Sequence, residues 1–92
     1  MRKFSPGKLC ATLESLQAIE EAGQTSLTFL QRHCQGDWGD IDVEDRRENE
    51  RGLLHGFRLL SAYNLQSGKR IWIITEADRS ATTILLVPPE EY

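Results

Sequence analysis

The last third of the chain contains two β-prone runs that lie very close together in the sequence. "RIWIIT" and "ATTILLV" are rich in β-branched and aromatic residues, and only a few residues separate them. A connection this short cannot make a crossover, so Ile71–Glu76 and Ala81–Leu86 are expected to be neighbouring antiparallel strands. Asp78 and Arg79 are expected to be exposed in the turn between them. Pro88 and the proline after it end the second run, because proline cannot continue a ladder.

A third strand is predicted just before this pair. "FRLLSAYNL", which begins at Phe57, alternates its side chains between two faces, and "QSG" has the composition of a turn. Three strands with short connections predict an antiparallel meander with Ile71–Thr75 at its centre. That central run is apolar on both faces. We therefore expect helices over one face of the sheet and another cover over the second face.

The first half of the chain has helical periodicity. "ATLESLQAIEEAG" predicts a helix that begins after Thr12, a good N-cap, and ends at Gly23. Thr25 and Gly36 bound a second predicted helix in the same way. A short extended segment, Lys8 to Ala11, is expected before the first helix. The expected inward stripes are Leu13, Leu16 and Ile19 on the first helix and Leu27, Leu30 and Cys34 on the second.

A third helix is expected from about Val43 to Leu54. Asp42 is a suitable cap, and acidic residues in the first turn suit the positive end of the helix dipole. The middle of this segment, "EDRRENER", is highly charged and offers little apolar surface. It is therefore expected to lie on the outside of the molecule.

Together these elements predict one α+β domain over residues 1–92, with N-terminal helices on one face of a three- to four-stranded antiparallel sheet. The content of 39% hydrophobic and 27% charged residues is typical of a globular chain. The net charge of −3 argues against bulk nucleic-acid binding. With no apolar run long enough for a bilayer and no signal-peptide pattern, the chain is expected to be cytoplasmic and without membrane contact.

Chemistry-bearing residues gather in "TEADRSA". Glu76 or Asp78 could act as a general acid or base, with Arg79 as an anion clamp and His55 as a further group, in a small nuclease or toxin-like enzyme. The alternative is a plain turn in which Arg79 pairs with a neighbouring acid. No nucleophile elbow or phosphate-binding loop accompanies these residues.

A second candidate is the turn-rich acidic segment "GDWGDIDVED". An aromatic side chain surrounded by acids can serve as a protein-binding anchor; alternatively, the tryptophan closes the seam between helices and sheet. The acids do not follow the calcium-loop pattern, and neither the histidines nor the two cysteines have zinc spacing, so no metal or cofactor is expected. The cysteines are expected to be buried. The proposed partner-binding residues are Asp37, Trp38, Asp40, Asp42, Glu44 and Asp45.

Four strings carry a resemblance: "RHCQGDWGD", "EDRRENERGLLHGFRLLSAY", "IWIITEADRSATTILL" and the ending "PPEEY". They resemble a family of small bacterial proteins described as plasmid-related, over nearly the whole chain from about Ala11. The family ending is "ILLPEEY", so Val87 and a second proline lengthen the tail here. The resemblance implies a plasmid, prophage or phage setting and assigns no catalytic residue.

These observations favour a non-enzymatic protein that binds a host or element-encoded protein. The resemblance adds an anti-defence role, such as inhibition of a CRISPR or restriction complex, as an expectation. A structural homodimer is a further alternative. Because the central strand is apolar on both faces, Trp72 and Ile74 are the residues expected at such a dimer interface.

Overall fold

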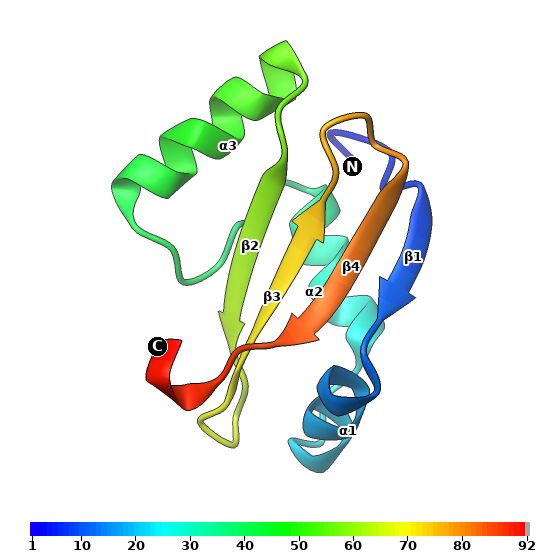
Figure 1. Cartoon of the computed structure of the whole chain (residues 1–92), viewed down its shortest axis with the longest axis vertical. Coiled ribbons are helices and arrows are strands. Elements are labelled where there is room, and N and C mark those ends of the chain that lie inside the picture. Colours follow the sequence, from blue (N-terminus) through cyan, green and yellow to red (C-terminus); the bar gives the residue numbers. More distant parts are fainter. Residues whose placement is uncertain (92) are drawn as a thin grey trace.

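A four-stranded sheet forms the framework of the computed structural model, which describes residues 1–91 (Figure 1). Its strands are β1 (Lys8–Ala11), β2 (Leu59–Asn64), β3 (Arg70–Thr75) and β4 (Ala81–Leu86). They lie in the order β1-β4-β3-β2. The pairs β2–β3 and β3–β4 are antiparallel, so the predicted meander and the predicted pairing of the last two strands are confirmed.

The sheet is mixed, and the prediction of a purely antiparallel sheet was wrong at one strand. β1 pairs with β4 in parallel, with Lys8 opposite Ala81 and Ala11 opposite Ile84. β1 is joined to the rest of the sheet only through the helices that follow it. The local turn rules that predict a meander therefore say nothing about its direction.

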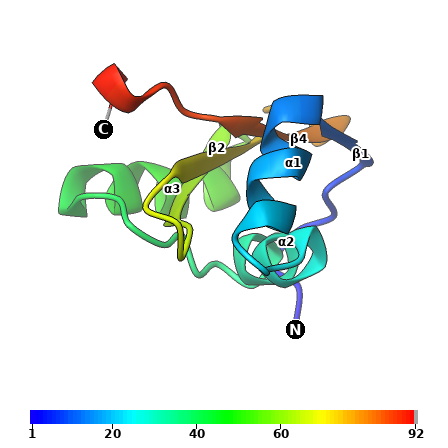
Figure 2. The ribbon, with the colours of Figure 1, turned by 90° about the horizontal axis from the view of Figure 1, so that it is seen from below.

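Three α-helices precede the meander: α1 (Leu13–Glu21), α2 (Ser26–Cys34) and α3 (Val43–His55). The side chains of Thr12 and Asp42 cap α1 and α3 by accepting from Ser15 N and Asp45 N. α1 and α2 cover one face of the sheet, whereas α3 lies beside β2 at the edge (Figures 1 and 2). This arrangement confirms the α+β class. Among the described residues, no helix is long and apolar enough to cross a lipid bilayer.

The first two helices bury only part of the stripes that the leucine pattern predicted: Ile19 and Cys34 are buried, but the residues at the start of each stripe are exposed. Leu13 and Leu27 are 67% and 62% exposed, whereas Ser15 is fully buried and Phe29 is 2% exposed. The Ser15 hydroxyl donates to the carbonyl of Ile84 on β4 over 3.2 Å. Because this contact holds the small side of α1 against the sheet, Leu13 and Leu16 are exposed, whereas Ile19 at the end of the same stripe is buried.

The core lies between the covered face of the sheet and the two helices. Phe29 on α2 packs against Tyr63 on β2, with ring centroids 5.3 Å apart. Cys34 is buried as predicted, Cys10 is half-buried, and both thiols are free. The buried cluster consists of Ala18, Ile19, Phe29, Tyr63, Leu65, Ile71, Ile73 and Ile84.

Candidate functional site

Arg79 in the β3–β4 turn serves as a structural clamp. Its Nη1 donates to the carbonyl of Phe57 over 2.7 Å and its Nη2 to the carbonyl of Gly52 over 2.8 Å, which ties the turn to the end of α3. Two further carbonyls in its own turn lie 3.2 Å from Nη1. The side chain is half-buried, so the prediction that Arg79 is exposed was wrong. A guanidinium held by four carbonyls has little capacity left to clamp an anion.

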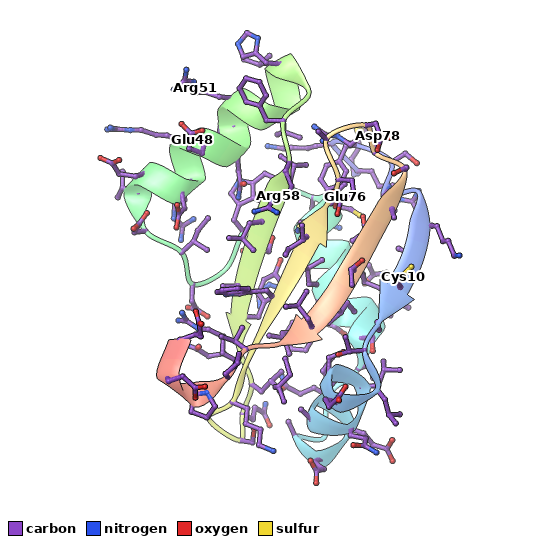
Figure 3. All side chains as sticks on the ribbon, viewed as in Figure 1. Cys10, Glu48, Arg51, Arg58, Glu76 and Asp78 are labelled. Carbon is purple, nitrogen blue, oxygen red and sulfur yellow. The ribbon has the colours of Figure 1, made fainter. Side chains whose placement is uncertain are left out.

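The other residues proposed for catalysis do not converge. Glu76 and Asp78 are exposed in the turn (Figure 3). The Asp78 carboxylate accepts from Ser80 N over 3.0 Å, and hydrogen bonds from Ser80 lower its pKa. His55 is exposed on α3, where its ring lies 5.9 Å from that of Phe57. These groups share no enclosed site in which they could act on one substrate.

The acidic residues are engaged mainly in local structure. Asp37 forms an ion pair with Arg32, Nε to Oδ2 2.7 Å, and the hydrogen bond from Arg32 lowers the pKa of this carboxyl. The Asp40 carboxylate accepts from Asn64 N over 3.0 Å, and Asp42 caps α3. Glu44 and Asp45 lie exposed in the first turn of α3, where they face the positive end of the helix dipole. Within residues 1–91, no group of three or more His, Cys, Asp and Glu side chains could hold a metal ion.

Trp38 belongs to the core. It is 2% exposed, and its Nε1 donates to Glu50 Oε2 on α3 over 2.8 Å. Its ring stacks on Phe4 at 6.4 Å and meets the edge of His33 at 5.7 Å. The indole therefore closes the seam between α3, α2 and the N-terminal segment, which was the structural alternative, and it is not presented to a partner.

The acidic segment and α3 together close the outer edge of β2. Ala62 N donates to Trp38 O over 3.1 Å, and Ala62 O accepts from Asp40 N over 2.6 Å. Two residues along the edge, the Asn49 amide takes the place of a neighbouring strand: its Nδ2 donates to Leu60 O over 2.7 Å and its Oδ1 accepts from Leu60 N over 3.0 Å. The outward N–H and C=O groups of residues 60 and 62 are thus all hydrogen-bonded.

A buried chain of hydrogen bonds crosses the covered face of the sheet. His33 on α2, fully buried, lies 2.5 Å from Ser61 Oγ at Nδ1 and 2.8 Å from Thr75 Oγ1 at Nε2. Thr75 and Thr82 are 2.7 Å apart, and the Thr82 hydroxyl donates to the carbonyl of Pro6 over 2.7 Å. Sequence analysis missed this chain because it considered the histidines only as metal ligands or, for His55, as a catalytic group. The available signal was a polar residue at an inward position on each of three strands.

The carbonyl at the end of this chain fixes the direction of its hydrogens. Because Thr82 donates to Pro6 O, it must accept from Thr75, which in turn accepts from Nε2–H of His33. Nδ1 is then the acceptor for the Ser61 hydroxyl. Burial, with a smaller contribution from the positive charge of Arg79, lowers the pKa of His33 to about 4. A neutral imidazole held on both nitrogens is a structural group, and this Ser–His contact is closed to substrate.

The second face of the sheet is the strongest candidate for a functional surface. Cross-strand register places Ala62, Trp72 and Leu85 in one row and Leu60, Ile74 and Thr83 in the next. Apart from the buried Ala62 these side chains are partly exposed, and α1 and α2 lie on the opposite face of the sheet (Figures 1 and 2). We call these six residues the open face. Arg58 and Glu76 lie at one end of it, and Cys10 lies beside it on β1 (Figure 3).

Of the residues proposed from the sequence, only Trp72 and Ile74 therefore lie on an apolar surface that is accessible to another molecule. Comparisons with protein-family models, with curated proteins and with solved structures found no match to the chain.

Proposed function

We propose that the protein is a non-enzymatic binding protein whose open face docks onto another protein. The observation that carries this proposal is the row of apolar side chains that the helices leave uncovered, with Trp72 on the central strand pair. A partly buried tryptophan beside branched aliphatic residues supplies the apolar area and the rigid aromatic anchor typical of protein interfaces. The scattered polar groups, and the contacts of Arg79 with four backbone carbonyls, favour binding over catalysis.

The identity of the partner is a separate part of the proposal. A second copy of the chain could cover the open face, as the apolar central strand predicts, or a host or element-encoded protein could do so. Inhibition of a host defence complex by a plasmid- or phage-borne protein is the form of this function that the sequence resemblance favours. The open face supports protein binding in either case and does not distinguish between the partners.

The test is a pair of matched variants used as bait in host extract. Trp72→Ser with Ile74→Ser makes the open face polar, whereas Leu54→Ser removes an apolar side chain that is 81% exposed at the end of α3. We expect a protein retained by the wild type and by Leu54→Ser to be lost from the double variant, with circular dichroism unchanged. Sedimentation of the wild type alone separates self-association from a foreign partner. Retention of every co-purifying protein by the double variant, together with a wild type that is monomeric at tens of micromolar, would contradict the proposal.

A further inference from the structure

The outer edge of β1 is open along its backbone. Lys8 N donates to Ser80 O and Thr12 N to Ile84 O, both over 3.0 Å, so the even-numbered residues of this strand face β4. In a parallel ladder the residues between them direct their N–H and C=O groups away from the neighbour. Leu9 and Ala11 thus present two donors and two acceptors outward, and within residues 1–91 no group pairs with them. Such a row is a template for another strand.

An apolar cleft lies directly beside this edge. It encloses about 280 Å³ between β1, α2 and the N-terminal segment, and its apolar lining includes Leu9, Leu27 and Leu30. Leu9 and Leu27 are 55% and 62% exposed at its mouth. Figure 2 shows the N-terminal segment running from β1 past α2, along the same side of the molecule. The cleft can therefore receive an apolar side chain from a segment that lies along β1.

The charges around the edge are basic, although the whole chain has a net charge of −3. Arg2 lines the cleft and Lys8 is exposed on β1 itself, while the first acidic residue of the chain is Glu14. Leu9 is paired with Thr82 on the covered face, so Lys8 lies on the opposite face of the strand. A segment that meets both features would alternate apolar residues, on the side of Leu9, with acidic residues, on the side of Lys8.

We propose that the β1 edge binds an extended acidic–apolar segment of another protein, which adds a fifth strand and places an apolar side chain in the cleft. Backbone hydrogen bonds to Leu9 and Ala11 give the segment its extended form, and the cleft fixes its register. A second copy of β1 fits less well. Antiparallel pairing about Cys10 puts Ala11 of one copy opposite Leu9 of the other, and a methyl group cannot fill the cleft. The β1 edge is distinct from the open face, so this proposal can be tested independently of the function proposed above.

The probe is a short capped peptide, EVELEVE, in which glutamate alternates with valine and leucine. NMR titration should shift the Leu9 and Ala11 amides and slow their hydrogen exchange. A peptide with an N-methyl group on the central leucine should bind at least about tenfold more weakly, because one or two backbone hydrogen bonds are lost. The basic analogue KVKLKVK should also bind more weakly, and the difference should shrink at high salt.

Two variants on the protein side test the edge and the cleft independently. Ala11→Pro removes one outward donor, and Leu27→Glu places a like charge against the peptide at the mouth of the cleft. Each should raise the Kd at least about tenfold. Leu54→Glu makes the same chemical change at the far edge of the molecule and should leave the Kd unchanged. Circular dichroism establishes that each variant is folded.

Three results would overturn the proposal. The first is no shift at Leu9 or Ala11 up to about 1 mM peptide, the affinity of a very weak complex. The second is equal affinity for the N-methylated or basic peptide. The third is a wild-type dimer that Ala11→Pro converts to a monomer, which would assign the edge to a second copy of the chain.

Discussion

The two edges of the sheet differ in whether their outward backbone groups are hydrogen-bonded. On the β2 side, the Asn49 amide and the backbone of Trp38 and Asp40 pair with the outward groups of Leu60 and Ala62. On the β1 side, the equivalent groups of Leu9 and Ala11 face outward without a partner among the described residues. An exposed strand edge invites pairing with other chains. One edge is therefore closed against such pairing, and the other remains available for it.

The closed edge uses an element that contributes little to the core. α3 is highly charged, and its buried residues are Asn49 and Gly52 alone. Gly52 allows close approach, because a Cβ there would lie 2.9 Å from Leu59 Cδ2. The helix is anchored instead by polar contacts to the sheet edge and by the Arg79 clamp. Its packing indicates that covering β2 is its main structural task.

The largest expected effect is at Trp38, which closes the β2 edge. Trp38→Ala should lower the free energy of unfolding by about 3–5 kcal/mol, because it leaves a cavity among Phe4, His33 and α3. That loss is a large part of the roughly 5–15 kcal/mol by which native domains are stable, so the variant should unfold at much lower denaturant concentration. Chemical denaturation followed by circular dichroism measures the loss.

Trp72→Ala is the matched control for that experiment. It removes the same side chain from the open face, where the indole is only partly buried, and should cost clearly less. Equal losses of unfolding free energy in the two variants would show that Trp38 does not stabilise the β2 edge more than its exposed counterpart stabilises the open face.

The second effect is a dependence of stability on pH through His33, whose ring contacts both Trp38 and Phe4, the latter ahead of β1. Its folded pKa of about 4 is below the usual value of 6.5, so the unfolded state binds more protons between these pH values. The stabilisation is complete above about pH 6.5 and is lost as the pH falls toward 4, by about 3 kcal/mol in total. Asp37 and Asp78, whose pKa values are lowered, lose their contributions at still lower pH.

Urea denaturation at a series of pH values tests this prediction. His33→Gln removes the titrating group and should flatten the profile between pH 6.5 and 4. His55→Gln changes an exposed histidine and should retain the wild-type slope. A slope that survives in His33→Gln would assign the pH dependence to other groups.

A smaller loss of unfolding free energy is expected when the Asn49 amide, which pairs with the backbone of β2, is removed. Asn49→Ala leaves the N–H and C=O of Leu60 without their partner and should cost about 1–3 kcal/mol, less where water can reach these groups. Hydrogen exchange should accelerate most at the Leu60 amide. Asn64→Ala, at an exposed position on the same strand, provides the comparison. Unchanged exchange at Leu60 would mean that α3 holds this edge without the amide.

Much of this framework could be predicted from the sequence, because it rests on local rules. The caps at Thr12 and Asp42 and the β3–β4 hairpin each follow from residues close together in the chain. The direction of β1 could not be predicted in this way, since its pairing with β4 joins residues more than 70 positions apart.

Some expectations about which side chains are buried failed for a related reason. Periodicity assigned Leu13 and Leu27 to the core, but polar contacts of Ser15 and His33 with the strands set the rotation of the two helices. Composition likewise indicated that Trp38 could be an exposed anchor. Its burial depends on α3, whose polar sequence gave no sign that it would cover an edge. Strand alternation did predict that Trp72 and Ile74 share one face of β3, opposite Ile71 and Ile73, but it could not tell which face the helices cover.

The smallest expected effect tests the contrast between the edges directly, through proline. Ala11→Pro removes an amide hydrogen that has no partner among the described residues, and proline is tolerated at such edge positions, so the free energy of unfolding should fall by no more than about 1 kcal/mol. Ala62→Pro makes the same change at the closed edge. There it deletes the bond to Trp38 O and forces a ring into a position that is 2% exposed, so a loss of about 3 kcal/mol or more is expected. Denaturation curves of the two variants give the difference. If Ala11→Pro proves as destabilising as Ala62→Pro, then β1 is also held by its outward groups, and the edge that we assign to a partner strand is already closed.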